Sequence, residues 1–152
     1  MPSLETDILY ELICSKRSCL EQLQAMGRRQ LELIESDRMT ALLDLLTKKQ
    51  QTLAELQQIE QQLNPFRNQT PESRRWRSEE ARRRCADALS ACETLLAEII
   101  QRERTSEQTL VRRRDHAAQQ LQGMHRAGQA RASYTSPNAG ALSQLDLCSD
   151  VS

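Results

Sequence analysis

The side chains of this chain best suited to bind a transition metal or to act as thiol nucleophiles or general bases are five cysteines and two histidines. Metal and redox sites need such residues at short, regular spacing, as in Cys-x-x-Cys. No two cysteines have that spacing, and His116 and His125 lie nine residues apart, on different sides of a helix. The chain also lacks a glycine-rich phosphate loop and a nucleophile elbow. We therefore predict that the protein is not an enzyme and uses no metal or other cofactor.

The cysteine pattern also indicates the cellular compartment. Cys85 and Cys92 are two turns apart on one predicted helix, about 10 Å along its axis, which is too far for a disulfide. We expect reduced cysteines that pack as small core residues in a cytoplasmic protein. The acidic N-terminal segment does not resemble a secretory signal, and no apolar run approaches the roughly 18 residues of a membrane span. We expect no membrane insertion.

A basic block is the second feature that could do chemistry. It consists of Arg74, Arg75, Arg77, Arg82, Arg83 and Arg84. The whole chain is neutral, with 21 basic and 21 acidic residues, whereas residues 67–84 carry 7 basic and 3 acidic side chains. Glu79 and Glu80 interrupt the block, and Trp76 is its one aromatic residue, so a solvated helix start is favoured. Pairing with the acidic first helices, an acidic protein partner and a nucleic-acid contact are the alternatives; we expect no nucleic-acid binding.

The elements that must position these residues are helices. The chain is 38% apolar, 28% charged and only 3% aromatic, which is typical of coiled coils. We predict an all-α fold in which an antiparallel hairpin and a long third helix form an elongated, coiled-coil-like bundle. The expected boundaries are a helical domain over 1–126, with helices at 4–35, 38–63 and 71–126, and a flexible tail over 127–152.

Local signals set those boundaries. Ser36 and Asp37 are good caps for the second helix, Asn64-Pro65 should end it, and Thr70-Pro71-Glu72 resembles the start of the third. Apolar residues recur at alternating three- and four-residue intervals in each helix. The bundle core predicted from that repeat comprises Ile13, Leu20, Leu23, Leu42, Leu46, Leu53, Leu56, Leu89, Leu96 and Ile99.

The predicted helix lengths do not match. At 1.5 Å per residue, the second helix spans roughly 38 Å and the third roughly 83 Å. The last 20 to 25 residues of the third helix would therefore lack an internal partner. Such a half-apolar segment is frayed, dimerises or binds another protein. Its exposed face would be formed by Leu110, Val111, Ala117, Ala118, Leu121 and Met124.

The hairpin corner resembles that of the FlgN-type flagellar export chaperones. Ser36-Asp37 match the small-residue-plus-Asp corner of that family, and Lys48 or Lys49 matches a lysine in the third turn of the following helix. Tyr134, followed shortly by Gly140, is similar to the tyrosine and glycine that follow the family's last helix. The resemblance covers roughly residues 4–140.

The resemblance implies a cytosolic, ATP-independent chaperone for flagellar hook–filament junction proteins. Such chaperones bind the client's helical C-terminal end and deliver it to the flagellar type III export gate. The family's client contact corresponds to the unpartnered face above, and its gate-docking tyrosine to Tyr134. We expect a monomer or weak dimer in the free state. The alternatives are a self-associating structural coiled coil and, less favoured, a nucleic-acid adaptor that uses residues 74–84.

Overall fold

The structure, a computed structural model, describes residues 4–135 of the chain. All regular secondary structure within that range is helical, so the prediction of an all-α fold is confirmed. The elements are α1 (Glu5–Glu35), α2 (Met39–Arg67), a short 3-10 helix η1 (Pro71–Ser73) and α3 (Glu79–Thr135).

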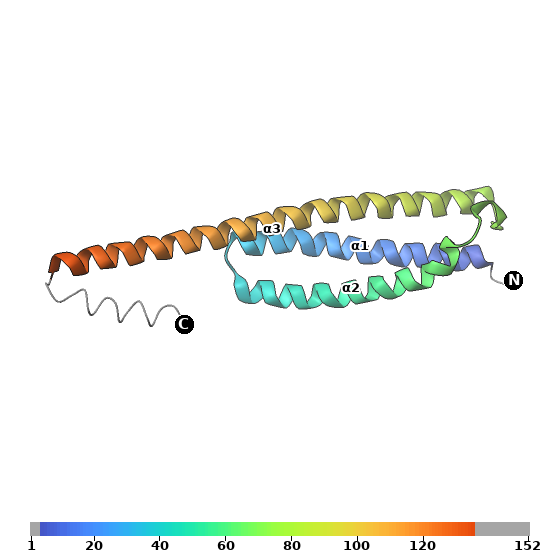
Figure 1. The fold of residues 1–152 in the computed structure, drawn as a ribbon. Helices are drawn as coiled ribbons and strands as arrows, with labels where there is room; N and C mark the ends of the chain where they lie inside the picture. Colours follow the sequence, from blue (N-terminus) through green and yellow to red (C-terminus); the bar gives the residue numbers. More distant parts are fainter. Residues whose placement is uncertain (1–3, 136–152) are drawn as a thin grey trace. The chain divides into compact units, whose positions relative to one another are not determined.

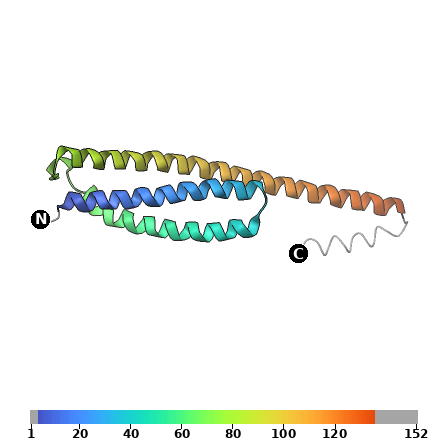
Figure 2. The same cartoon turned by 180° about the vertical axis from the view of Figure 1, so that it is seen from behind.

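The chain divides into two units, residues 1–109 and 110–152. The first unit contains α1, α2, η1 and residues 79–109 of α3. Within it, α1 lies beside α2 on one side and beside the first part of α3 on the other (Figures 1 and 2). The described residues of the second unit are 110–135, the remaining part of α3.

The α1–α2 hairpin turns at Ser36–Arg38. Asp37 has a φ of 60°, the left-handed conformation that a short polar side chain tolerates. The N–H of Arg38 donates to the Leu33 carbonyl at 3.0 Å, and the N–H of Ser36 donates to the Glu32 carbonyl at 3.0 Å. These bonds satisfy carbonyls at the end of α1. Ser36 and Asp37 therefore close α1, whereas the sequence pattern had predicted caps for the start of α2.

Burial is concentrated on α1. Leu20 and Ile34 have no exposed surface, and Ile13, Leu23 and Leu42 are also buried. Leu46, Leu56 and Ile99 are half-buried. The main apolar cluster draws on all three helices, and a smaller one at the hairpin joins Leu33, Ile34 and Leu42.

Three of the predicted core residues lie outside the core. Leu53, Leu89 and Leu96 are 37%, 43% and 41% exposed, so their assignment to the core was wrong. The core-facing residues of α3 are Cys85, Ala88, Cys92, Leu95 and Ile99. The predicted core of this helix shares Ile99 with the observed set. At the other two positions the prediction chose Leu89 and Leu96, each one residue beyond the buried Ala88 and the half-buried Leu95.

The distance between the helices explains why small residues of α3, rather than its leucines, face the core. Ala88 and Cys92 on α3, and Thr52 on α2, are small and buried. Small residues facing a neighbouring helix let the two backbones approach closely, so they occupy the interface while adjacent leucines turn outward. Hydrophobicity alone favours the leucines, which explains the error.

Three helix ends also differ from the prediction, the first of them the end of α2. α2 runs through Pro65 to Arg67, because Phe66 packs against the main cluster. Arg67 donates to Glu60 and, at 2.8 Å, to Asn64, which further stabilises the last turn against the local cost of the proline.

The third helix starts later and ends later than predicted. Thr70-Pro71-Glu72 form part of a single 3-10 turn, in which the N–H of Ser73 donates to the Thr70 carbonyl at 3.0 Å. The hydroxyl of Ser78 caps α3 instead, accepting from the N–H of Ala81 at 3.0 Å. Residues 127–135 of the predicted tail are helical, and 136–152 lie outside the described residues.

The corrected stripe can be tested with two neighbouring leucines of α3. Leu95→Ala is expected to lower the free energy of unfolding by about 2 kcal/mol, because it removes apolar contacts inside the cluster. Leu96→Ala, the matched control on the outward face, should cost less than about 1 kcal/mol. Urea unfolding followed by circular dichroism measures both. Equal losses would contradict the stripe.

Candidate partner-binding surface

Residues 110–135 form a helix rich in Arg, Gln and Ala, all of which have high helix propensity. Four of its large apolar side chains are exposed. Leu121 and Met124 are 66% and 65% exposed, and Leu110 and Val111 are each 39% exposed. A helix with this much exposed apolar area is a candidate surface for a partner.

The apolar side chains gather on one face. Leu110, Ala117, Leu121 and Met124 follow one another at steps of seven, four and three residues, which places them along one stripe of a helix. Val111 and Ala118 lie along one edge of that stripe, and Ala117 and Ala118 are both exposed. We call this stripe, with its edge, the distal face.

The helix that carries the distal face is positively charged. Between residues 110 and 135 the chain carries Arg112, Arg113, Arg114, Arg126 and Arg131 against the single acid Asp115, a net charge of +4 with neutral histidines. An amphipathic helix with acidic flanks is complementary to such a surface.

Tyr134 is 92% exposed and stands away from the distal face, about a third of a turn round the helix axis. It is thus available for contacts separate from those of the distal face.

Two arginines of the block link different segments of the first unit, and a third pairs along its own helix. Arg77 pairs with Asp7 on α1 at 2.8 Å, Arg84 pairs with Glu80 at 2.7 Å, and Arg74 donates to the Phe66 carbonyl at 2.7 Å. The hydrogen bond from Arg77, followed by that from the Leu4 N–H, lowers the pKa of Asp7. Pairing with the acidic first helices was one of the alternatives predicted for the block, and Arg77 makes such a pair. Arg75, Arg82 and Arg83 are exposed.

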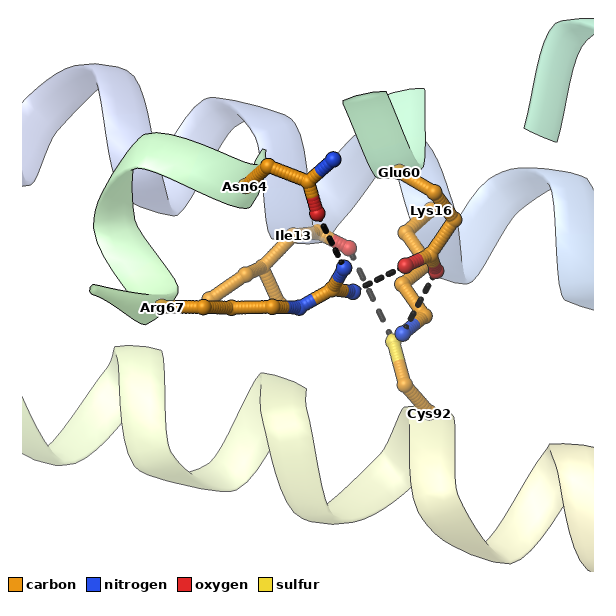
Figure 3. A network of polar contacts seen from close by, with 6 residues as sticks. All are labelled: Ile13, Lys16, Glu60, Asn64, Arg67 and Cys92. Atoms are coloured by element: carbon orange, nitrogen blue, oxygen red, sulfur yellow. Dashed lines mark hydrogen bonds and ion pairs between the residues drawn. The ribbon is translucent and has the colours of Figure 1, made fainter. Parts of the chain in front are cut away.

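A polar network joins α1 and α2 beside α3 (Figure 3). Glu60 accepts from Lys16 at 2.8 Å and also from Arg67. Burial raises the pKa of Glu60, but the hydrogen bonds and charges of Lys16 and Arg67 together outweigh it, so the pKa lies below its usual value. The network thus holds an ionised glutamate at the border of the apolar cluster.

The cysteines that the structure describes are free thiols. Cys85 and Cys92 are buried between helices, and the Cys92 thiol lies 3.7 Å from the Ile13 carbonyl as a weak donor (Figure 3). Burial raises the pKa of both thiols, which keeps them neutral near pH 7. Cys148 lies outside the described residues.

Residues 4–135 contain no group of three or more His, Cys, Asp or Glu side chains arranged to hold a metal ion. Among the helices in that range, none combines the length and the apolar character of a membrane span.

Comparison with known proteins gives one match. A family model described as FlgN protein matches residues 1–139, which is most of the chain. No curated protein and no solved structure matches it.

The ion pairs of Glu60 predict a pH dependence. Because its pKa is lowered in the folded state, the stabilisation is present above the unfolded pKa of about 4.3 and is lost as the pH falls below it. Wild type should therefore exceed Glu60→Gln in free energy of unfolding at pH 7, and the difference should shrink between about pH 5 and pH 3. Urea titrations at several pH values measure it. A difference that stays constant with pH would contradict the ion-pair assignment.

Proposed function

This chain belongs to the FlgN family of flagellar export chaperones, and from that premise we propose that its distal face holds the C-terminal helical end of hook–filament junction proteins. Family membership supplies the general role, the binding of flagellar export substrates. The observation that carries the finer proposal is the exposed apolar stripe of Leu110, Ala117, Leu121 and Met124.

The proposed mechanism is the pairing of two amphipathic helices. An apolar stripe on the client covers Leu121 and Met124, and burial of each such side chain contributes on the order of 1.5–3 kcal/mol before ordering costs. Ala117 and Ala118 leave room for the client's backbone to approach. The net positive charge of this helix favours a client helix with acidic flanks.

The proposal requires no nucleotide. A client helix binds by burial and leaves by mass action, so the cycle can be driven by transfer of the client to the export gate. We assign gate docking to Tyr134, whose exposed ring can serve as an anchor without disturbing the distal face. Both events take place in the cytosol under this proposal.

The double variant Leu121→Ala/Met124→Ala tests the distal face. It removes apolar area but retains helix propensity, so we expect at least a tenfold weaker affinity for a hook–filament junction protein of the same genome. The matched control is Met39→Ala/Leu43→Ala, which removes the same two residue types from an exposed site of the first unit. Isothermal titration calorimetry measures both.

Two results would contradict this assignment. Unchanged client affinity in the double variant would place the contact elsewhere. A light-scattering mass of twice 17.4 kDa that persists on dilution in wild type, and is lost in the double variant, would identify the distal face as a dimer seam instead.

Tyr134→Ala separates holding from delivery. The ring stands apart from the distal face, so the variant should bind the client with wild-type affinity while supporting less client secretion. Calorimetry and the amount of secreted junction protein are the two measurements, with Ser133→Ala, its exposed neighbour, as the control. Wild-type secretion by Tyr134→Ala would exclude the role in docking.

A further inference from the structure

A pocket of about 270 Å³ opens in the first unit where α2 ends and α3 begins. Its floor is apolar and belongs to the main cluster, with Leu9, Ile13 and Leu63 among the lining residues. Phe66 and Trp76, both half-buried, form part of its wall. The volume suits one or two side chains of a partner, and the lining favours apolar ones.

Four cations and no acids line the pocket: Lys16, Arg67, Arg74 and Arg82. Lys16 and Arg67 share the single carboxylate of Glu60, so these three side chains together keep one net positive charge (Figure 3). Arg74 uses one terminal nitrogen on the Phe66 carbonyl, and its Nε is buried without a hydrogen-bond partner among the described residues. Arg82 is exposed at the rim. The pocket thus carries uncompensated positive charge beside an apolar floor.

The apolar surface continues from the pocket along α3. Arg82, Ala86 and Leu89 line the pocket at steps of four and three residues. The same outward stripe reaches Leu96 and Ile100, with the exposed Glu93 as its one acidic position between Leu89 and Leu96. Leu89, Leu96 and Ile100 are each more than two-fifths exposed. From Leu89 to Ile100 the stripe spans about 16 Å of helix axis, roughly three turns. A surface of that length fits a helix better than a small molecule.

We propose that this pocket and stripe form a second protein-binding site, which takes an amphipathic partner helix with apolar residues along one face and carboxylates at the end beside the pocket. An apolar side chain of the partner enters over Leu9 and Ile13. The adjacent carboxylates accept charge-assisted hydrogen bonds from Arg82 and Arg74, the two uncompensated cations. The negative end of a helix dipole, at its C-terminus, adds to the same attraction.

This site goes beyond the proposed client-holding function. All its residues lie in the first unit, whereas the distal face lies in the second. The two can therefore be tested independently, and the failure of one proposal leaves the other standing.

Trp76 supplies the measurement, because it is the only tryptophan of the chain and lines the pocket. The full-length protein is titrated with a synthetic helical peptide that has no tryptophan, leucines at a three- and four-residue repeat, and a glutamate-rich C-terminal turn. The comparison peptide carries glutamine in place of each glutamate and an amidated end. We expect a saturable shift of Trp76 emission with the acidic peptide, and at least about fivefold weaker binding of the glutamine peptide.

Two matched pairs of variants locate the contact. Arg82→Gln should weaken binding of the acidic peptide about five- to tenfold, whereas Arg83→Gln, its exposed neighbour outside the pocket, should leave it unchanged. Leu89→Ala should also weaken binding, and Leu121→Ala should not. Higher salt should reduce the affinity of wild type more than that of Arg82→Gln.

Three outcomes would overturn the proposal. These are the absence of a saturable Trp76 shift, equal affinity for the acidic and glutamine peptides, and equal losses in Arg82→Gln and Arg83→Gln. Urea unfolding of each variant verifies that the exposed substitutions leave the fold intact.

Discussion

The first unit depends on the burial of α1 from two sides. α2 and the first part of α3 each pack on it, so its buried face is wider than a simple heptad stripe and includes Cys19 and Leu33 as well as Leu20 and Ile34. A helix in that position must be apolar over about half its circumference. The other two helices need only one core-facing stripe each. Their remaining apolar residues, such as Leu53 and Leu89, are left on the surface.

Periodicity predicted the helices and their order because it depends on local sequence. In α3 it placed Ile99 correctly against the main cluster, and Cys85 and Cys92 pack in that cluster as expected of reduced cysteines. Periodicity could not decide whether the next buried residue lies three or four places after each of these positions. That choice depends on how closely two helices approach, and this distance is set by small residues on both partners. Ala88 and Leu89 are adjacent, and only the packing of α3 on α1 decides which of them is inside.

The distal face and the pocket also differ in how far the sequence predicts them: the first depends on local sequence and the second on tertiary contacts. The exposure of Leu121 and Met124 could be predicted from the sequence, because it follows from the lengths of the helices and from the apolar repeat of the last one. The pocket could not, because its wall is held by bonds between residues far apart in the chain. The Thr6 hydroxyl donates to the Arg75 carbonyl at 2.6 Å, and Arg77 pairs with Asp7. The sequence offered one indication of the pocket. The only phenylalanine and the only tryptophan of the chain, Phe66 and Trp76, lie near the two ends of the segment that joins α2 to α3.

The contacts that residues 79–109 of α3 make with α1 and α2 change from apolar to polar along the helix. Near its start, Cys85, Cys92 and Ile99 meet an apolar cluster, and Arg77 just before it pairs with α1. Further on, Lys49 of α2 bridges Gln30 and Glu103, so a polar contact joins the three helices there.

The buried hydroxyl of Ser106, in the next turn of α3, has no hydrogen-bond partner among the described residues. An unsatisfied buried hydroxyl costs on the order of 1–3 kcal/mol. Because the hydroxyl gains no hydrogen bond in exchange, the burial of Ser106 must be maintained by other contacts of the first unit. This position therefore depends on the packing of its neighbours, whereas Cys92 contributes directly to the main apolar cluster.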